Sequence, residues 1–161
     1  MKKFLILLFV LLTQNAFAES ISGGIVKNTV DDRFFGNWMV RGEIIGSAPK
    51  EFKSSTSQIW NLWKNGNVII LENRLSGARG EVKVDKAFSS SDGAFLKFTN
   101  IDEKDLGEGE KIKLIETPEI TLKDDSFSGT DKFEIQKYKN GALYSQKVVK
   151  YQITGRKFRE Y

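Results

Sequence analysis

The chain has 161 residues, with 25 basic and 21 acidic side chains, a formal charge of +4, and neither cysteine nor histidine. Without these two residue types it cannot form disulfides, Cys–His or Ser–His nucleophile pairs, or the commonest metal sites. Charges of both signs are interspersed, so the clustered basic face that nucleic acid requires is absent as well.

The N-terminus has the three parts of a secretory signal. Two lysines carry positive charge, residues 4–12 form an unbroken apolar run, and Ala16 and Ala18 supply the small residues that a signal peptidase requires. The apolar run is too short to cross a membrane as a helix. We therefore expect residues 1–18 to be a signal peptide that is cleaved after Ala18. The product would be periplasmic or extracellular, with no membrane anchor.

The exported part has a formal charge of +2, because the signal holds two lysines and no acid, and it is long enough for one domain. Residues 19–33 are polar and glycine-containing, which predicts a weakly ordered lead-in. From residue 34 to residue 161, apolar and polar residues alternate, and turn residues recur about every eight to twelve positions. Helical periodicity is not sustained, so the pattern predicts a single all-β domain over residues 34–161.

Within this domain the alternation predicts eight or nine antiparallel strands joined by sequential hairpins. Asn65-Gly66 and Asn140-Gly141 favour the two positive φ angles of a type I′ turn. The predicted strands cover residues 34–44, 56–64, 67–74, 79–88, 94–101, 111–116, 119–123, 129–139 and 142–156. A meander of this length is expected to close as an up-and-down barrel; the alternative is a two-sheet β-sandwich, since either arrangement removes exposed edges.

The segment from Asp102 to Glu110 is the most acidic in the chain, and we interpret it as an exposed loop. Carboxylate oxygens in a loop can bind Ca²⁺, but the spacing here does not match a calcium-binding loop. A solvated loop is the favoured interpretation, and no metal site is predicted. Whether this segment binds a cation stays open at the level of sequence.

Phe35-Gly36-Asn37-Trp38 stands at the start of the first predicted strand. The motif resembles the N-terminal G-x-W signature of the lipocalin and wider calycin group. The resemblance implies that Gly36 lets the chain enter a barrel, that Trp38 plugs its closed end, and that Arg156, late in the last strand, packs over the Trp38 ring. The central motif, the cysteines and the C-terminal helix of that group are not recognisable, so an unrelated barrel or sandwich remains an alternative.

The alternation also predicts which side chains face the interior of such a barrel. Barrels of about eight strands are either filled by side chains or hold one small ligand. The predicted interior positions, and therefore the candidate ligand-binding residues, are Trp60, Leu62, Ile70, Val82, Val84, Phe98 and Tyr151.

Trp60 and Trp63 are three residues apart in one predicted strand, so their side chains point to opposite faces. Trp60 shares a face with Leu62 and is predicted to be core. Trp63 is either an exposed platform for a sugar or a protein partner, or a side chain packed under the serine-rich loop 46–57. Packing under the loop is the favoured interpretation.

These observations predict an exported, non-catalytic binding protein without a cofactor. The first hypothesis is a small apolar ligand held inside the barrel. The alternative is an envelope interaction or inhibitor module with a filled interior, which contacts its partner through Trp63 or a hairpin tip. A carboxylate-based hydrolase has no motif in its favour, and the oligomeric state is left open.

Overall fold

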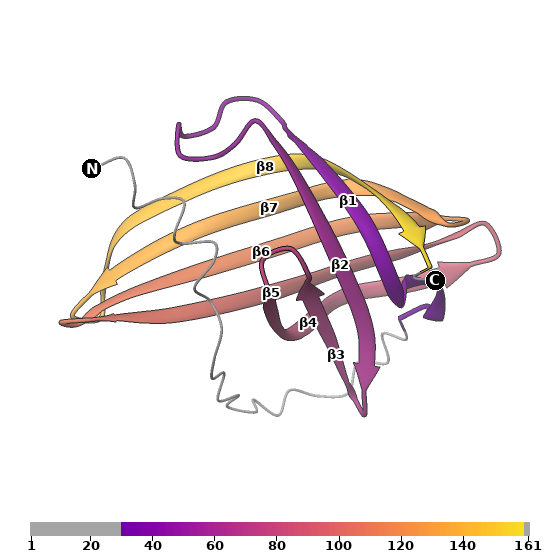
Figure 1. Ribbon diagram of the computed structural model, residues 1–161, viewed down its shortest axis with the longest axis horizontal. Helices are drawn as coiled ribbons and strands as arrows, with labels where there is room; N and C mark the ends of the chain where they lie inside the picture. The colour runs from indigo at the N-terminus through magenta and orange to yellow at the C-terminus, as the bar shows by residue number, and fades with distance from the viewer. Residues whose placement is uncertain (1–29, 160–161) are drawn as a thin grey trace.

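The computed structural model describes residues 30–159, so the predicted signal peptide and most of the predicted lead-in lie outside the described residues. Between residues 30 and 159, eight antiparallel strands follow one another, and each pairs with the next (Figure 1). The last strand pairs with the first, so the sheet closes as an up-and-down barrel and the sandwich alternative is wrong. The strands are β1 (Gly36–Ile44), β2 (Ser55–Asn65), β3 (Val68–Asn73), β4 (Ala78–Ser90), β5 (Gly93–Gly107), β6 (Glu110–Lys123), β7 (Ser126–Lys139) and β8 (Ala142–Phe158).

The acidic segment is strand rather than loop over most of its length, which corrects the sequence interpretation. Residues 102–105 belong to β5 and pair with residues 111–114 of β6. The Glu103 carboxylate forms ion pairs with Lys111 and Lys113 of the neighbouring strand, and the Lys113 ammonium lies 3.1 Å from it. The charges therefore complement a second strand, and only the turn Glu108-Gly109, with φ angles of 52° and 73°, remains as a loop.

The two short strands predicted on either side of Pro118 are one strand, β6. The β6–β7 ladder runs without interruption through Pro118, which pairs with Asp131. On the other side, the β5–β6 ladder stops at Glu119 and resumes at Glu116. The proline, which lacks a backbone N–H, thus interrupts pairing with one neighbour only.

Aromatic rings fill the core of the barrel. The Phe127 ring lies 5.0 Å from the Trp38 ring and 5.9 Å from the Trp60 ring, centroid to centroid, and Trp60 in turn contacts Phe98 at 6.2 Å. Gly155 makes room for this packing, because a Cβ atom there would stand 2.2 Å from the Phe127 ring. The core therefore contains a continuous cluster of aromatic rings from strands in both halves of the chain.

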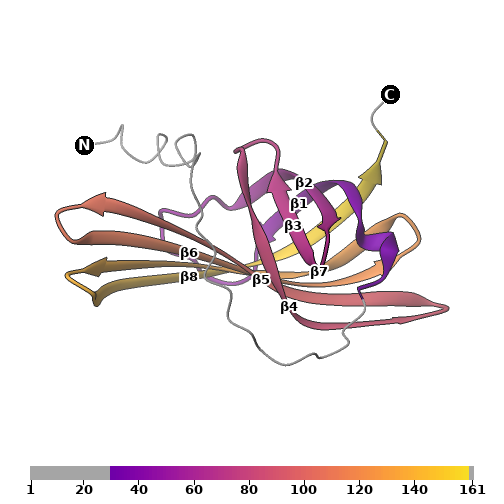
Figure 2. The same cartoon turned by 90° about the horizontal axis from the view of Figure 1, so that it is seen from below.

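The half of the sheet built from β5 to β8 is longer than the barrel. Pairing with β4 ends at Asn100, and pairing with β1 ends near Lys150, where Ile45 N–H donates to the Lys150 carbonyl at 2.8 Å. Beyond these points, residues 101–115 and 134–149 continue as two hairpins that extend from the barrel, at the left of Figures 1 and 2. We call these residues the projecting sheet. Both of its outer edges lack a paired strand within the described residues.

Candidate functional site

One end of the barrel is closed by Trp38 and the residues that precede β1. Trp38 is buried, and its indole N–H donates to the Phe34 carbonyl at 2.8 Å. Val30 and Phe34 are buried in the same core, so residues 30–33 pack with the barrel although the sequence assigns them to the lead-in. Gly36 has φ of +127°, and a Cβ atom there would lie 3.0 Å from the Lys157 side chain, so the chain enters the barrel at a position that only glycine fits.

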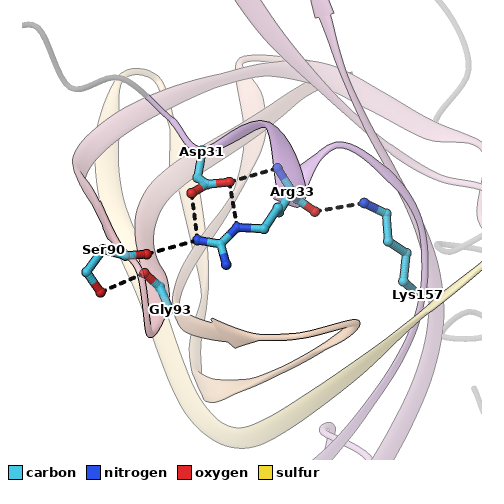
Figure 3. Close-up of polar contacts among 5 residues, drawn as sticks. All are labelled: Asp31, Arg33, Ser90, Gly93 and Lys157. Atoms are coloured by element: carbon cyan, nitrogen blue, oxygen red, sulfur yellow. Dashed lines mark hydrogen bonds and ion pairs between the residues drawn. The ribbon is translucent and has the colours of Figure 1, made fainter.

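The cation over the Trp38 ring is Lys157 rather than Arg156. The Lys157 ammonium lies 5.3 Å from the Trp38 ring centroid and donates to the Arg33 carbonyl at 2.8 Å (Figure 3). Because Ile153 and Gly155 face inward, the next inward position is 157, and Arg156 is exposed. The predicted role of Arg156 is therefore wrong by one residue.

Asp31 and Arg33 fasten the chain before β1 to the β4–β5 turn (Figure 3). Asp31 accepts from the Arg33 backbone N–H and from two guanidinium nitrogens, at 2.8–2.9 Å. The guanidinium also donates to the Ser90 carbonyl at 3.3 Å. These bonds from Arg33 lower the pKa of Asp31 to about 2.

Most of the predicted interior positions lie in the barrel core. Val84 is half-buried and packs against the core, and the others are buried in it: Trp60, Leu62, Val82, Phe98 and Tyr151. Their role in ligand binding stays a prediction.

Ile70 is the exception, because it lies on the outer face of β3. The hairpin loop is Gly66-Asn67, one residue later than predicted, and it pairs Asn65 with Val68. This register pairs the inward Leu62 with Leu71, which joins the core in place of Ile70. Ile70 is buried on the other face, where its ladder partner is Trp63.

Trp63 is half-buried, and the serine-rich loop does not cover it. The Arg79 guanidinium lies 4.7 Å from the Trp63 ring centroid, which is the geometry of a cation–π contact. The loop packs at the other end of β2, where Phe52 contacts Phe133 at 6.1 Å. The favoured interpretation of Trp63 is therefore wrong in its partner, and Arg79 takes the place of the loop.

Sequence reasoning missed a pair of carboxyl groups inside the barrel. Glu116 of β6 and Asp131 of β7 are in hydrogen-bonding contact, and the Asn100 side chain also bonds Glu116. Asp131 is 4% exposed, whereas Glu116 is half-buried, and the Oδ1 atom of Asp131 has no hydrogen-bond partner within residues 30–159. Burial raises the pKa of both groups, and the charge of Glu116 raises that of Asp131 further. The alternation from Gly129 to Phe133 places position 131 inward, so this signal was present in the sequence.

The tips of the two projecting hairpins are fastened to each other. Asn140 N–H donates to the Gly109 carbonyl at 2.8 Å, and the Lys139 ammonium pairs with Glu110 at 3.2 Å. Beside the tips lies a hollow of about 470 Å³. It is lined by Glu103, Asp105, Gly109, Glu110, Lys111, Lys113, Tyr138 and Gly141.

Large apolar side chains are exposed at the same tips. Leu106 and Leu143 are each 48% exposed, and Tyr144 is 57% exposed. Within the described residues, no group of three or more acidic side chains is arranged to hold a metal ion. The same part of the chain contains no helix of the length and apolarity needed to span a membrane.

The comparisons with known proteins assign no family. No family model matches the chain, and no curated protein or solved structure gives a match.

Proposed function

We propose that the protein is an exported, non-catalytic interaction module that acts through the tips of its two projecting hairpins. The supporting observation is a group of three large apolar side chains exposed together at the tips of the projecting hairpins. The barrel is packed with aromatic rings, whereas Leu106, Leu143 and Tyr144 are exposed at tips held in place by the Asn140–Gly109 bond. Exposed apolar side chains on a fixed scaffold are typical of a protein-binding surface.

The partner that fits these tips is a protein surface of the cell envelope. Leucine and tyrosine side chains bury apolar area on contact, and Tyr144 can add a hydrogen bond through its hydroxyl. The hollow beside them contains three acidic residues and two lysines, so its charges of both signs suit a polar rim. Neither a nucleic acid nor a small apolar ligand matches this mixture.

A photo-crosslinking residue in the exported protein tests the proposal. Benzoylphenylalanine replaces Tyr144 in one variant, and it replaces Leu75 in a matched control, because Leu75 is 62% exposed at the distant β3–β4 turn. We expect a discrete adduct from position 144 that is absent from position 75. Adding Leu106→Ser and Leu143→Ser should then reduce its yield several-fold. Equal labelling from both positions, or none from position 144, would contradict the proposal.

The proposal assumes export, which rests on the charged, apolar and small-residue segments of residues 1–18. Those residues lie outside the described part of the chain. Mass spectrometry of protein recovered from the periplasm or the medium should identify Glu19 as the first residue. A retained N-terminus, or protein confined to the cytoplasm, would overturn the proposed localisation.

We further propose that the barrel is of the lipocalin or calycin type. The support is Gly36 at the barrel entry, the buried Trp38 and a basic side chain over its ring, although that side chain is Lys157. In this type of barrel a small apolar ligand would be an alternative function. The packed rings weigh against it, and native mass spectrometry of the exported protein should show the mass of the chain alone.

A further inference from the structure

The loop between β1 and β2, residues 45–54, is fixed at its ends by backbone bonds of Ile45 and Ser54, and two side-chain contacts hold it to the ladder partners of the carboxyl pair. The Tyr151 hydroxyl donates to the Lys53 carbonyl at 3.1 Å, and Tyr151 is the ladder partner of Asp131. The Phe52 ring contacts Phe133, which is the ladder partner of Glu116. A third, partly exposed contact joins Glu51 of the loop to Lys147 of β8. The loop and the carboxyl pair therefore share their neighbours.

We propose that residues 45–54 form a lid whose closure depends on a proton held by Glu116 and Asp131. With the proton in place, the two carboxyl groups can hydrogen-bond to each other and the lid packs over them. Without it, two negative charges face each other beside the closed lid, on the buried Asp131 and the half-buried Glu116. Ionised buried carboxylates gain free energy from hydration, and opening of the lid is the local change that would supply it.

Among residues 30–159, the groups around the pair with a shifted pKa or a hydrogen bond to it carry no positive charge. Asn100 of β5 is neutral, and Tyr151 of β8 is a phenol whose pKa is raised by burial and by Asp131. The backbone N–H of Thr117 bonds Asp131 and favours its charged form. Two lysines in or near the lid do not neutralise the pair: Lys147 pairs with Glu51, and Lys53 is exposed. Asp102 on β5 is a further acid, and burial raises its pKa.

The direction of the response follows from linkage. The closed state holds the proton more tightly than the open state, so closure is favoured at low pH and is lost as the pH rises through the raised pKa of the pair. For one proton, the ratio of open to closed lid should increase about tenfold for each pH unit within the titration range. The lid therefore opens on the alkaline side.

Hydrogen exchange of residues 45–54, measured by mass spectrometry across pH 5–9 and corrected for the intrinsic rate, tests the lid. In the wild type, protection of this segment should fall about tenfold per pH unit once the pair titrates, while that of β3 and β4 changes little. Asp131→Asn and Glu116→Gln should each weaken this pH dependence. Glu81→Gln, which changes an exposed carboxyl on β4, should leave it as in the wild type.

Tyr151→Phe distinguishes the hydrogen bond that holds the lid from the carboxyl pair that makes it respond to pH. Loss of the hydroxyl bond to Lys53 should raise exchange of residues 45–54 at every pH and leave the pH dependence in place. The proposal is overturned if Asp131→Asn and Glu116→Gln both keep the wild-type pH dependence, or if β3 and β4 lose protection in parallel with the loop. If one carboxyl variant fails to fold, the other decides the outcome.

Discussion

At the scale of single residues, the buried Trp38 ring is in contact with the partly buried ammonium group of Lys157. Truncation of the buried indole in Trp38→Ala should lower the free energy of unfolding by about 3–5 kcal/mol. The loss for Trp63→Ala should be markedly smaller, because Trp63 is half-buried under Arg79. Urea titrations of both variants compare the two losses, and equal values would contradict the strand register.

The contact between Lys157 and Trp38 can be isolated by a double-mutant cycle. Trp38→Phe combined with Lys157→Gln should give a coupling energy above about 0.5 kcal/mol, as expected for side chains in contact. The matched cycle uses Arg156→Gln, one residue earlier on the exposed face, and should be additive. Coupling at position 156 with none at 157 would restore the pairing that the lipocalin resemblance implied.

Asp31 gives a pH-dependent prediction at the same scale. Its folded pKa of about 2 lies below the ordinary value of 3.8, so its contribution is present above pH 4 and is lost as the pH falls through 2. Asp31→Ala removes the bonds to Arg33 and should cost about 0.5–1 kcal/mol at pH 6, allowing for solvent screening. In acid, urea titrations of the two proteins should converge; a gap that persists at pH 2 would mean that the carboxylate charge is not the cause.

At the scale of elements, the close approach of β7 and β8 depends on Gly155. Gly155→Ala would place a methyl group against the Phe127 ring, and such overpacking should cost about 1–3 kcal/mol or more. Thr154→Ala on the outward face of the same strand should cost less. Phe127→Leu added to Gly155→Ala should recover part of the loss, which thermal unfolding can measure. No recovery would show that the ring is not what excludes the methyl group.

Within individual strands, the sequence was sufficient to predict most of the inward-facing side chains. Alternation identified the inward side chains of β2, β4, β5 and β8, because these strands face one core and at least part of their other face is polar. It failed for Ile70, where β3 is apolar on both faces and only the hairpin register decides. It also failed for residues 102–105, because an acidic segment read alone is typical of a solvated loop. The lysines that offset its charge lie on the neighbouring strand β6. Alternation places Asp131 inward, but the carboxyl pair itself was missed because only the pairing of β6 with β7 brings Glu116 next to Asp131.

At the scale of the whole molecule, the ring of eight strands should contribute more to the free energy of unfolding than the projecting sheet does. Thr154 of β8 pairs with Ser128 on one side and Arg41 on the other, whereas Gln146 of the same strand pairs only with Gln136 among the described residues. Both positions lie an even number of residues from Lys150, whose carbonyl faces β1. Their backbone groups therefore point to the same side, towards β1 at Thr154 and towards an unpaired edge at Gln146.

A proline at each position, compared with an alanine at the same position, tests this difference. Proline removes the backbone N–H, and alanine accounts for the lost side chain, which at Gln146 donates to Glu134 at 2.6 Å. Thr154→Pro breaks the β1–β8 seam that closes the barrel and should cost about 3 kcal/mol or more of the free energy of unfolding. Gln146→Pro removes an N–H that bonds no described strand, so it should cost far less and raise hydrogen exchange only within the projecting sheet. Urea unfolding followed by tryptophan fluorescence reports on the barrel, where Trp38 and Trp60 are buried. Equal losses for the two variants would mean that the projecting sheet and the barrel fold as one cooperative unit.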